Sequence, residues 1–294
     1  MSFRTRFAPS PTGPLHLGHA YSAILAHDMA LAEGGEFLLR IEDIDQSRAR
    51  PEWEAMIYDD LKWLGLYWEE PVMRQSERME AYREALEGLW ARQWLYECTC
   101  NRRDVLEAAS APQEGVTFGP DGLVYPGTCR GAWHPDDAPM PEDATLRFRM
   151  DGFVPRDSRF EHRITGAEGG VDLAHFIETG HGPEEQTGRV EFDIHTLPQS
   201  VGDVVLARKD MGTSYHLSVV LDDAEQAITH VVRGEDLFEA TKIHVILQKT
   251  LGLPTPTYHH HRLIRDASGK RLAKRDDALS LIHISEPTRP FTLS

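Results

Sequence analysis

The 294-residue sequence has few cysteines, no long apolar run and fewer basic than acidic residues. Three cysteines exclude a disulfide-rich scaffold, and their clustering at positions 98, 100 and 129 favours a reduced compartment and metal binding. No stretch reaches the roughly 18 apolar residues of a membrane span, and the N-terminus lacks the apolar segment of a secretory signal, so we expect a cytoplasmic protein without membrane attachment. The 31 basic and 47 acidic residues give a net charge of -16, which argues against non-specific coating of nucleic acid but allows a local basic patch.

Apolar periodicity in the first hundred residues predicts alternating strands and helices. A hydrophobic content of 40% is sufficient for a globular protein with a large core. We expect a strand at 3–8, a helix at 17–33, a buried strand at 37–41 and a helix at 52–64, followed by an amphipathic helix at 79–90. This order favours an α/β fold with a parallel sheet.

An irregular insertion interrupts this pattern. Residues 111–141 contain six prolines and five glycines, which exclude a long helix or a central strand there. The elements expected beyond it complete the sheet domain: extended segments at 144–150, 203–208 and 215–221, a hairpin turn at 209–212, a strand at 228–232 and a helix at 237–251 ended by Gly252.

Two short segments carry residues suited to phosphate chemistry. The strand-to-helix turn after residue 8 places His16 and His19 in the first helical turn, which attracts anions, and Gly18 lets a base or ribose approach the backbone. The loop Ser268–Arg275 carries several cations, including Lys274, that can neutralise charge on a transferring phosphate. Each segment alone is equally compatible with a solvated surface loop, but their pairing around alternating strands and helices favours a nucleotide site.

Together these motifs resemble the catalytic core of class I aminoacyl-tRNA synthetases. The similarity covers about residues 3–277, in the order of the glutamyl branch, through Arg6–Gly13, Arg40–Asp45, Tyr215, Val232–Leu237 and the Lys274 loop. The resemblance implies an α/β fold with a Rossmann-like parallel sheet and a zinc-containing insertion. It also implies an enzyme of the ligase type that forms an aminoacyl-adenylate.

The resemblance divides the chain into regions. It implies the first half of the catalytic domain at 1–97, an acceptor-binding-like insertion with a zinc site at 98–190, and the second half with the lysine loop at 191–278. Residues 279–294 lack the polar, helical pattern of the family at this point. We interpret them as an atypical tail that is not native sequence, and assign them no function.

The acceptor follows from the resemblance and not from composition. The chain stops about twenty residues after Lys274, where conventional glutamyl-tRNA synthetases continue with a helical anticodon-binding region. This shorter plan resembles a paralogous branch that attaches glutamate to the queuosine base of tRNA(Asp), so we expect glutamate, ATP and queuosine-containing tRNA(Asp) as partners of a monomer. Two alternatives stay open: a compact glutamyl-tRNA synthetase that charges a 3′ end, and a non-catalytic, zinc-stabilised RNA-binding module.

A glutamate pocket requires cationic or multi-donor groups for two carboxylates and an acidic group for the ammonium. The resemblance assigns Arg6 and Tyr215 to one carboxylate and Arg233 to the other, with Glu42 and Ser10 at the ammonium. Without the resemblance, Glu42 is better interpreted as a strand-end acid and Tyr215 as a core residue.

Activation of glutamate is an in-line attack of its carboxylate on the α-phosphate of ATP, which positioning and charge neutralisation promote. The resemblance makes His16, His19 and Lys274 the catalytic candidates and adds Gly18 to the ATP site. Ala273 stands where the family often has serine, so a hydroxyl donor is missing while the cation of Lys274 remains. Magnesium is expected with ATP, although no carboxylate cluster predicts a protein-bound Mg²⁺ site.

Cys98, Cys100 and Cys129 offer three thiolates for one structural Zn²⁺, which requires a fourth ligand. Ligand chemistry favours His134, whereas the family resemblance favours Tyr125, four residues before Cys129. We choose Tyr125 and keep His134 as the alternative. Three reduced core cysteines without a metal are the competing interpretation.

The run His259–His261 also invites a metal interpretation, because imidazole is a common ligand. Consecutive residues of a strand point to opposite faces, so three histidines in a row do not easily bind one ion. We instead expect a strand at the sheet edge near the nucleotide, with one histidine against the adenine.

Overall fold

The structure is a computed structural model that describes residues 2–109, 117–131, 133–153 and 173–264. Lys274, the loop around it and the tail at 279–294 lie outside these residues. Seven α-helices occur in the described ranges: α1 (Leu17–Ala32), α2 (Pro51–Trp63), α3 (Met79–Ala91), α4 (Arg102–Ala109), α5 (Leu197–Ser200), α6 (Tyr215–Glu225) and α7 (Ala240–Leu251). None of them combines the length and apolar character that crossing a bilayer requires.

Parallel strands form the framework of the fold. The strands β1 (Arg4–Phe7), β2 (Glu36–Ile41) and β3 (Glu69–Arg74) make one parallel sheet in the order β1-β2-β3. In a second sheet, β11 (His230–Gly234) pairs in parallel with β12 (Thr257–His261). The strands expected at 3–8, 37–41 and 228–232 are therefore confirmed.

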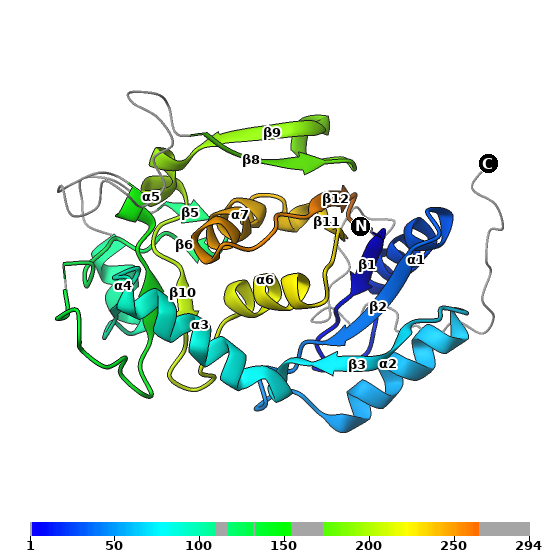
Figure 1. The fold of residues 1–294 in the computed structure, drawn as a ribbon, viewed down its shortest axis with the longest axis horizontal. Coiled ribbons are helices and arrows are strands. Elements are labelled where there is room, and N and C mark those ends of the chain that lie inside the picture. The colour runs from blue at the N-terminus through cyan, green and yellow to red at the C-terminus, as the bar shows by residue number, and fades with distance from the viewer. Residues whose placement is uncertain (1, 110–116, 132, 154–172, 265–294) are drawn as a thin grey trace.

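The two sheets adjoin where β1 lies against β11 (Figure 1). The backbone N–H of Thr229 donates to the Arg4 carbonyl at 3.0 Å, and the Arg4 N–H donates to Thr229 Oγ1 at 2.8 Å. The resulting strand order is β3-β2-β1-β11-β12. The chain adds strands to one side of β1 first and later to the other side, as in Rossmann-like folds, so the strand order has a switch point between β1 and β11. Such a switch point is where ligands bind in open α/β sheets.

The remaining strands flank this framework. β12 also pairs with β8 (Leu173–Glu178), and β8 pairs antiparallel with β9 (Gly188–Asp193). Two small antiparallel sheets belong to the region after α3, in the orders β10-β7-β4 and β5-β6. Their strands are β4 (Leu95–Glu97), β5 (Phe118–Gly119), β6 (Gly122–Leu123), β7 (Leu146–Phe148) and β10 (Val205–Ala207).

The helix after β1 packs tightly because its buried face is made of alanine. Its buried residues recur every three or four positions and leave no long side chain between helix and sheet: Ala20, Ala23, Ala26 and Ala30. The helix ends before Gly34, which has φ +60°, and a Cβ on Gly35 would lie 2.0 Å from the Phe3 carbonyl oxygen. Both glycines are thus required where the chain turns back into β2.

The segment expected to be extended at 215–221 is helical, and this prediction was wrong. It opens α6, and residues 209–212 form the turn into this helix instead of a hairpin. Ser214 caps α6, with Oγ accepting from Leu217 N at 3.5 Å. The helix is buried on most of its surface, which hides the helical period, and Val219 with Val220 raises the strand propensity.

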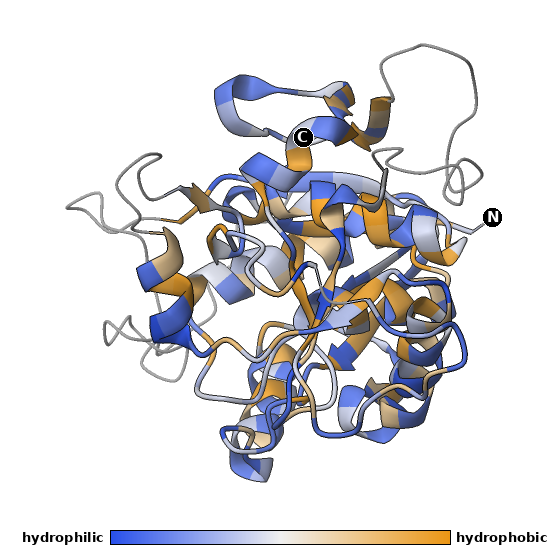
Figure 2. Cartoon of the chain, turned by 90° about the vertical axis from the view of Figure 1, so that its left-hand side faces the viewer, coloured by the Kyte–Doolittle hydropathy of each residue, from blue (hydrophilic) through white to orange (hydrophobic). Residues whose placement is uncertain are grey.

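Two large hydrophobic clusters and a small one around Tyr96, Cys98 and Tyr125 fill the interior. One large cluster lies between the first sheet and α1 and α2, and the other surrounds α3, α6 and α7. Hydrophobic segments lie mainly on the inner faces of these elements, and hydrophilic ones on the outside (Figure 2). In Figure 1, α6 and α7 lie between the β1–β3 layer and the insertion, so these two helices can connect both parts of the molecule.

Candidate active site

Two adjoining cavities lie at the carboxyl ends of β1 and β11. The first has a volume of about 240 Å³ and is lined by the end of β1, the start of α1 and the end of β11. The second, of about 330 Å³, is lined by loops after β1 and β2 and by the start of α6. Glu42, Tyr215 and Leu237 line both, so the two cavities form one continuous site at the switch point of the sheet.

The first cavity collects most of the residues that the sequence predicted for ATP and glutamate. They come from four separate parts of the chain: Arg6, His16, Gly18, His19, Glu42, Tyr215 and Arg233. Ser10 lines the second cavity, beside Glu42 and Tyr215. The structure therefore brings the two histidines and the two selective arginines to a shared cleft, while Lys274 lies outside the described residues.

The start of α1 provides a compact group of donors. His16 is the N-cap, its Nδ1 accepts from Gly18 N at 3.1 Å, and His19 Nδ1 accepts from His16 N at 3.2 Å. The two imidazoles stack with their centroids 3.7 Å apart. A Cβ on Gly18 would lie 3.0 Å from the His16 ring, so glycine permits this arrangement. Because both Nδ1 atoms accept, the proton of each ring is on Nε2, and the helix dipole adds to the attraction for an anion here.

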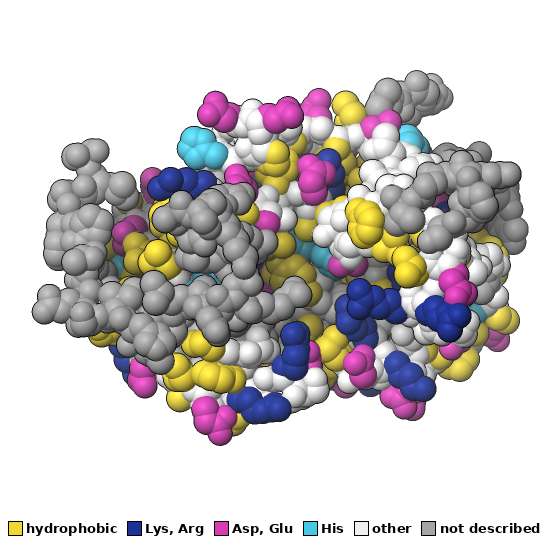
Figure 3. All heavy atoms as spheres, turned by 180° about the vertical axis from the view of Figure 1, so that it is seen from behind, with side chains coloured by type: hydrophobic (Ala, Val, Ile, Leu, Met, Phe, Trp, Pro, Cys, Tyr) yellow, Lys and Arg dark blue, Asp and Glu magenta, His cyan; other side chains and the backbone are white. Residues whose placement is uncertain are grey.

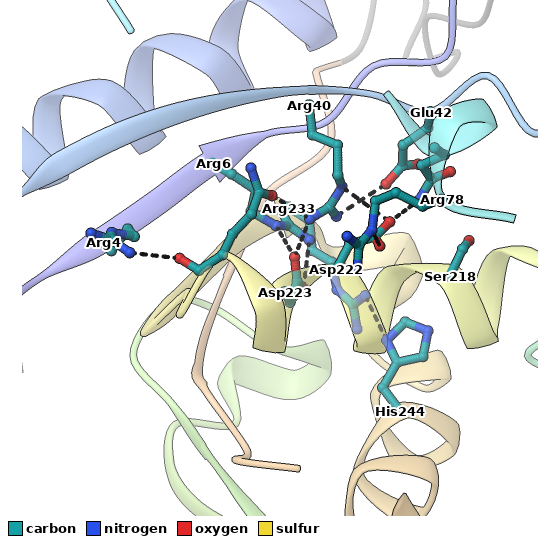
Figure 4. Close-up of polar contacts among 12 residues, drawn as sticks. Arg4, Arg6, Arg40, Glu42, Arg78, Ser218, Asp222, Asp223, Arg233 and His244 are labelled. Carbon is teal, nitrogen blue, oxygen red and sulfur yellow. Dashed lines mark hydrogen bonds and ion pairs between the residues drawn. The ribbon is translucent and has the colours of Figure 1, made fainter. Parts of the chain in front are cut away.

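A buried network of arginines and acids lies behind the cavity residues Arg6 and Glu42 (Figure 4). Arg6 donates to both oxygens of Asp223, at 3.0 and 3.3 Å. Arg40, which is fully buried, donates to Asp223 at 2.7 Å and to Glu42 at 3.2 Å. Burial alone would lower the pKa of Arg40, but Asp223, Glu42 and Asp222 raise it above the usual value. The charge of Arg6 is thus largely matched within the protein.

Arg233 has a different environment. Arg233 is 6% exposed, its Nε donates to His260 Nε2 at 3.1 Å, and its Nη1 lies 3.1 Å from His244 Nδ1. Its Nη2 donates to Thr241 Oγ1 at 2.7 Å and to the Leu237 carbonyl at 3.2 Å. All of these partners are uncharged groups, and within residues 2–109, 117–131, 133–153 and 173–264 no carboxylate forms an ion pair with Arg233, which lines the cavity.

Burial also affects the acid and the phenol of the site. Burial raises the pKa of Glu42 above its usual value, and the guanidinium groups of Arg40 and Arg6 oppose this shift only in part. Burial likewise raises the pKa of Tyr215, so its hydroxyl stays protonated and can donate to a carboxylate. The cavity therefore offers one acidic acceptor and one neutral donor side by side.

Several residues of the site were not predicted from the sequence. Arg40, Asp222 and Asp223 form the charged network behind Arg6 and Glu42, and His261 lines the first cavity with its Nε2 2.5 Å from Ser22 Oγ. Arg40 stands in the Arg40–Asp45 motif, but nothing local reveals its partner 183 positions away. The paired acids of α6 were missed because the segment before them, 215–221, was predicted to be extended and no element was predicted at 222 and 223.

The histidine run was predicted at a sheet edge, and this placement was wrong. β12 lies between β11 and β8, so His259–His261 belong to an inner strand. The strand pairing buries His260 completely and leaves His261 facing the first cavity. The three imidazoles also have different partners, in agreement with the argument that they do not share one ion.

The three cysteines converge in the insertion. Their sulfur atoms lie within 4.8 Å of one another, and Cys100 Sγ is 3.5 Å from Cys129 Sγ. The Tyr125 hydroxyl is 3.5 Å from Cys98 Sγ and 3.6 Å from Cys100 Sγ. Tetrahedral Zn²⁺ with bonds of about 2.0–2.3 Å separates its ligand atoms by about 3.5–3.8 Å, so the donor set fits this ion. Burial favours the neutral Cys129 thiol, but hydrogen bonds from Tyr125 and Thr99 lower its pKa to about 6.

His134 lies in another environment. Its ring stacks on Trp90 with centroids 3.7 Å apart, and its Nδ1 lies 3.2 Å from Gln93 Nε2. It does not belong to the group of potential metal ligands found among the described residues. Gly127, with φ +84°, instead turns the chain so that Cys129 N donates to the Tyr125 hydroxyl at 2.8 Å. This geometry favours Tyr125 over His134 as the fourth donor.

Known proteins resemble this chain over most of its length. Residues 2–155 and 176–286 match the family of tRNA synthetases class I (E and Q), catalytic domain. A glutamyl-Q tRNA(Asp) synthetase of Rhodobacter capsulatus is 60% identical over 277 residues, which cover 94% of this chain and 92% of that protein. A protein of the same name from Deinococcus radiodurans is 41% identical over 279 residues, covering 95% of this chain and 81% of the relative.

Solved structures give the same assignment of fold. A glutamate tRNA ligase of Elizabethkingia meningosepticum, crystallised in complex with its amino acid, matches with a TM-score of 0.68 and 27% identity. The match covers 94% of this chain and 52% of the ligase, so this chain spans about half its length. The parallel sheet, the switch-point cavity and the matched regions agree with one another. The chain therefore belongs to the class I tRNA synthetases and, within them, to the glutamyl-Q tRNA(Asp) synthetases.

Proposed function

We propose that the protein activates glutamate with ATP and transfers the glutamyl group to the queuosine base of tRNA(Asp). A carboxylate oxygen of glutamate attacks the α-phosphorus of ATP, and pyrophosphate leaves as the glutamyl-adenylate forms. The acceptor then attacks the adenylate carbonyl, and AMP leaves. The main observation in support is the first cavity, in which Arg233, Glu42 and Tyr215 lie next to the N-terminus of α1. The names of the relatives support the acceptor.

Glutamate is held by complementary charges in this proposal. Arg233, with its charge unmatched, binds one carboxylate, and Tyr215 with Arg6 binds the other. Glu42 accepts hydrogen bonds from the ammonium, with Ser10 next to it in the adjoining cavity. The existing pair between Arg6 and Asp223 supports a secondary contribution from Arg6, because two of its donors are already used.

The phosphates of ATP bind at the start of α1. His16 and His19 stabilise the phosphate region together with the backbone around Gly18, and Lys274 neutralises charge on the departing pyrophosphate. No side chain becomes a covalent nucleophile in this reaction. Rate acceleration then depends on positioning and on charge stabilisation, and Mg²⁺ accompanies ATP as part of the substrate.

The second cavity admits the acceptor. It shares Glu42 and Tyr215 with the first and is lined on the other side by Pro120 and Asp121 of the insertion. On the back face of the molecule, Lys and Arg side chains gather across the lower middle among scattered acidic ones (Figure 3). Such a local basic surface supports contact with phosphates of tRNA although the net charge is -16.

The insertion is part of the same proposal. We assign residues 98–190 to an acceptor-binding-like insertion between the catalytic halves at 1–97 and 191–278. One structural Zn²⁺ held by Cys98, Cys100, Tyr125 and Cys129 orders a segment that lacks a large core of its own. The ion has no role in the reaction itself.

Two assays on the same preparation test this function. Glutamate-dependent exchange of labelled pyrophosphate into ATP measures activation, and labelled glutamate measures transfer to tRNA(Asp) with and without queuosine. We expect exchange and transfer only to the modified tRNA(Asp). Stable labelling of tRNA(Glu) instead would identify a compact glutamyl-tRNA synthetase. The absence of exchange from a folded, zinc-loaded sample would contradict enzymatic activation altogether.

A further inference from the structure

Two directed hydrogen-bond chains converge on the guanidinium of Arg233. An arginine only donates, so His244 Nδ1 and His260 Nε2 must both be unprotonated acceptors. In His260 the proton is then on Nδ1, which faces Glu178 Oε2 at 2.5 Å. This first chain runs from Arg233 through one imidazole to a fully buried carboxylate.

The second chain is longer and ends in the insertion. With Nδ1 of His244 accepting, its Nε2 carries the proton and donates to His216 Nδ1 at 3.1 Å. The other nitrogen of His216 lies 3.3 Å from Asp121 Oδ1 in the turn between β5 and β6. Every donor and acceptor along the chain from Arg233 to Asp121 is thereby fixed.

Both imidazoles next to Arg233 are neutral in this arrangement. Burial, together with the positive charge of Arg233, lowers the pKa of His244 well below its usual value. Burial also lowers the pKa of His260, although its hydrogen bond to Glu178 opposes this shift. Each carboxylate is separated from the guanidinium by at least one neutral ring.

Nearby arginines are held in the opposite way. Arg6 and Arg40 contact Asp223 directly, and Arg40 also contacts Glu42. Among the described residues, no carboxylate pairs with Arg233. Hydrogen bonds therefore hold all three guanidinium groups in place. Carboxylates neutralise the charges of Arg6 and Arg40, whereas the charge of Arg233 stays available to a ligand.

We infer that His244 and His260 are positioning residues, which hold Arg233 rigidly by accepting its N–H groups while leaving its charge available to an anionic group of the substrate. This inference rests on the proposed function, in which Arg233 binds a glutamate carboxylate. Neither imidazole lines the cavity, so both act through Arg233. Replacing a neutral acceptor with a carboxylate satisfies the same N–H group but cancels the charge that selects glutamate.

A pair of isosteric variants tests charge separately from shape. In His244→Asn the amide oxygen reaches approximately the position of Nδ1, and His244→Asp places a carboxylate there. We expect the KM for glutamate in pyrophosphate exchange to be about 10- to 100-fold higher in H244D than in H244N, because the new carboxylate pairs with Arg233. The KM for ATP should be the same in both. Equal KM values for glutamate would overturn the inference, since a merely structural role does not respond to charge.

His230 offers a matched control. It lies on β11 like Arg233, but its ring stacks on Phe3 and its Nδ1 contacts Thr229, so H230N and H230D should share one KM for glutamate. If H244D does not fold, His244→Leu removes the acceptor without adding charge. A rise of about tenfold in the KM for glutamate, at constant KM for ATP, then supports the inference, and an unchanged value overturns it. Wild-type protein without exchange would instead contradict the proposed function.

Discussion

Glu42 is the cavity residue whose protonation state matters most for binding. It must be ionised to attract an ammonium, yet burial raises its pKa in the substrate-free protein above the ordinary value. The attraction is thus present at high pH and is lost as the pH falls through this raised pKa. For an exposed glutamate the same loss would occur at lower pH.

The substitution Glu42→Gln tests this role. In the wild type, the KM for glutamate should rise as the pH falls through the pKa of Glu42. In E42Q the KM should be about 10- to 100-fold higher at neutral pH and should lack this dependence, because no ionised acceptor remains. Pyrophosphate exchange across a pH series measures both effects. The exposed Glu80→Gln serves as control, and an unchanged pH profile in E42Q would exclude Glu42 as the ammonium site.

Arg233 should act on glutamate and not on ATP. Removing its guanidinium leaves a substrate carboxylate unpaired, so Arg233→Ala should lower kcat/KM for glutamate about a hundredfold. The Kd of ATP, measured by calorimetry, should change little, because the phosphates are assigned to the start of α1. Arg83→Ala, on the exposed face of α3, is the matched control. Equal losses for glutamate and ATP would mean that the pocket is assigned incorrectly.

At the scale of elements, α6 shows what the sequence could not reveal. A helix buried on most sides has no polar stripe and resembles a buried strand. This error also affected the predicted site, because eight residues span about 12 Å in a helix and about 26 Å in a strand. Only as a helix can this segment place Tyr215 at the cavity and Asp223 against Arg6.

Strongly amphipathic or turn-bounded elements were predictable. The break at Pro9–Pro14 separates β1 from α1, the break at Gly34–Gly35 separates α1 from β2, and α3 shows a regular apolar stripe. The cysteine cluster was predictable as well, because Cys98, Cys100 and Cys129 lie close together in the sequence. The sequence alone left the fourth zinc ligand open, because ligand chemistry favoured His134 and the family resemblance favoured Tyr125.

The cysteine loop gives a prediction about zinc. A purified chain should contain one zinc ion, and a strong chelator should remove it and lower the Tm, because binding orders this segment. Tyr125→Phe removes the hydroxyl that contacts Cys98 and Cys100, so it should release zinc faster. His134→Ala should retain the ion, because His134 stacks on Trp90 instead.

Elemental analysis together with a colorimetric release assay measures both variants. Loss of zinc from H134A with retention in Y125F would reverse the ligand assignment. Retention in both would show that the three thiolates suffice.

At the scale of the whole molecule, distant segments are joined by buried charges. Asp223 of α6 receives hydrogen bonds from Arg6 of β1 and Arg40 of β2, which lie 217 and 183 positions away in the sequence. A second acid of the same helix, Asp222, accepts from Arg78 and Tyr82 at 2.7 and 2.8 Å. No local pattern predicts such pairs, because each partner alone looks like an ordinary strand or helix residue.

The link between β1, β2 and α6 therefore predicts a large loss of stability in Asp223→Asn. The variant keeps the shape of the side chain but leaves two buried guanidinium groups without their shared carboxylate, which should cost about 3–5 kcal/mol of unfolding free energy. Urea unfolding measures this cost. Glu87→Gln, which breaks an exposed ion pair with Arg83 on α3, should leave the midpoint nearly unchanged. Equal midpoints for D223N and E87Q would show that the buried carboxylate of Asp223 does not stabilise the packing of α6 against β1 and β2.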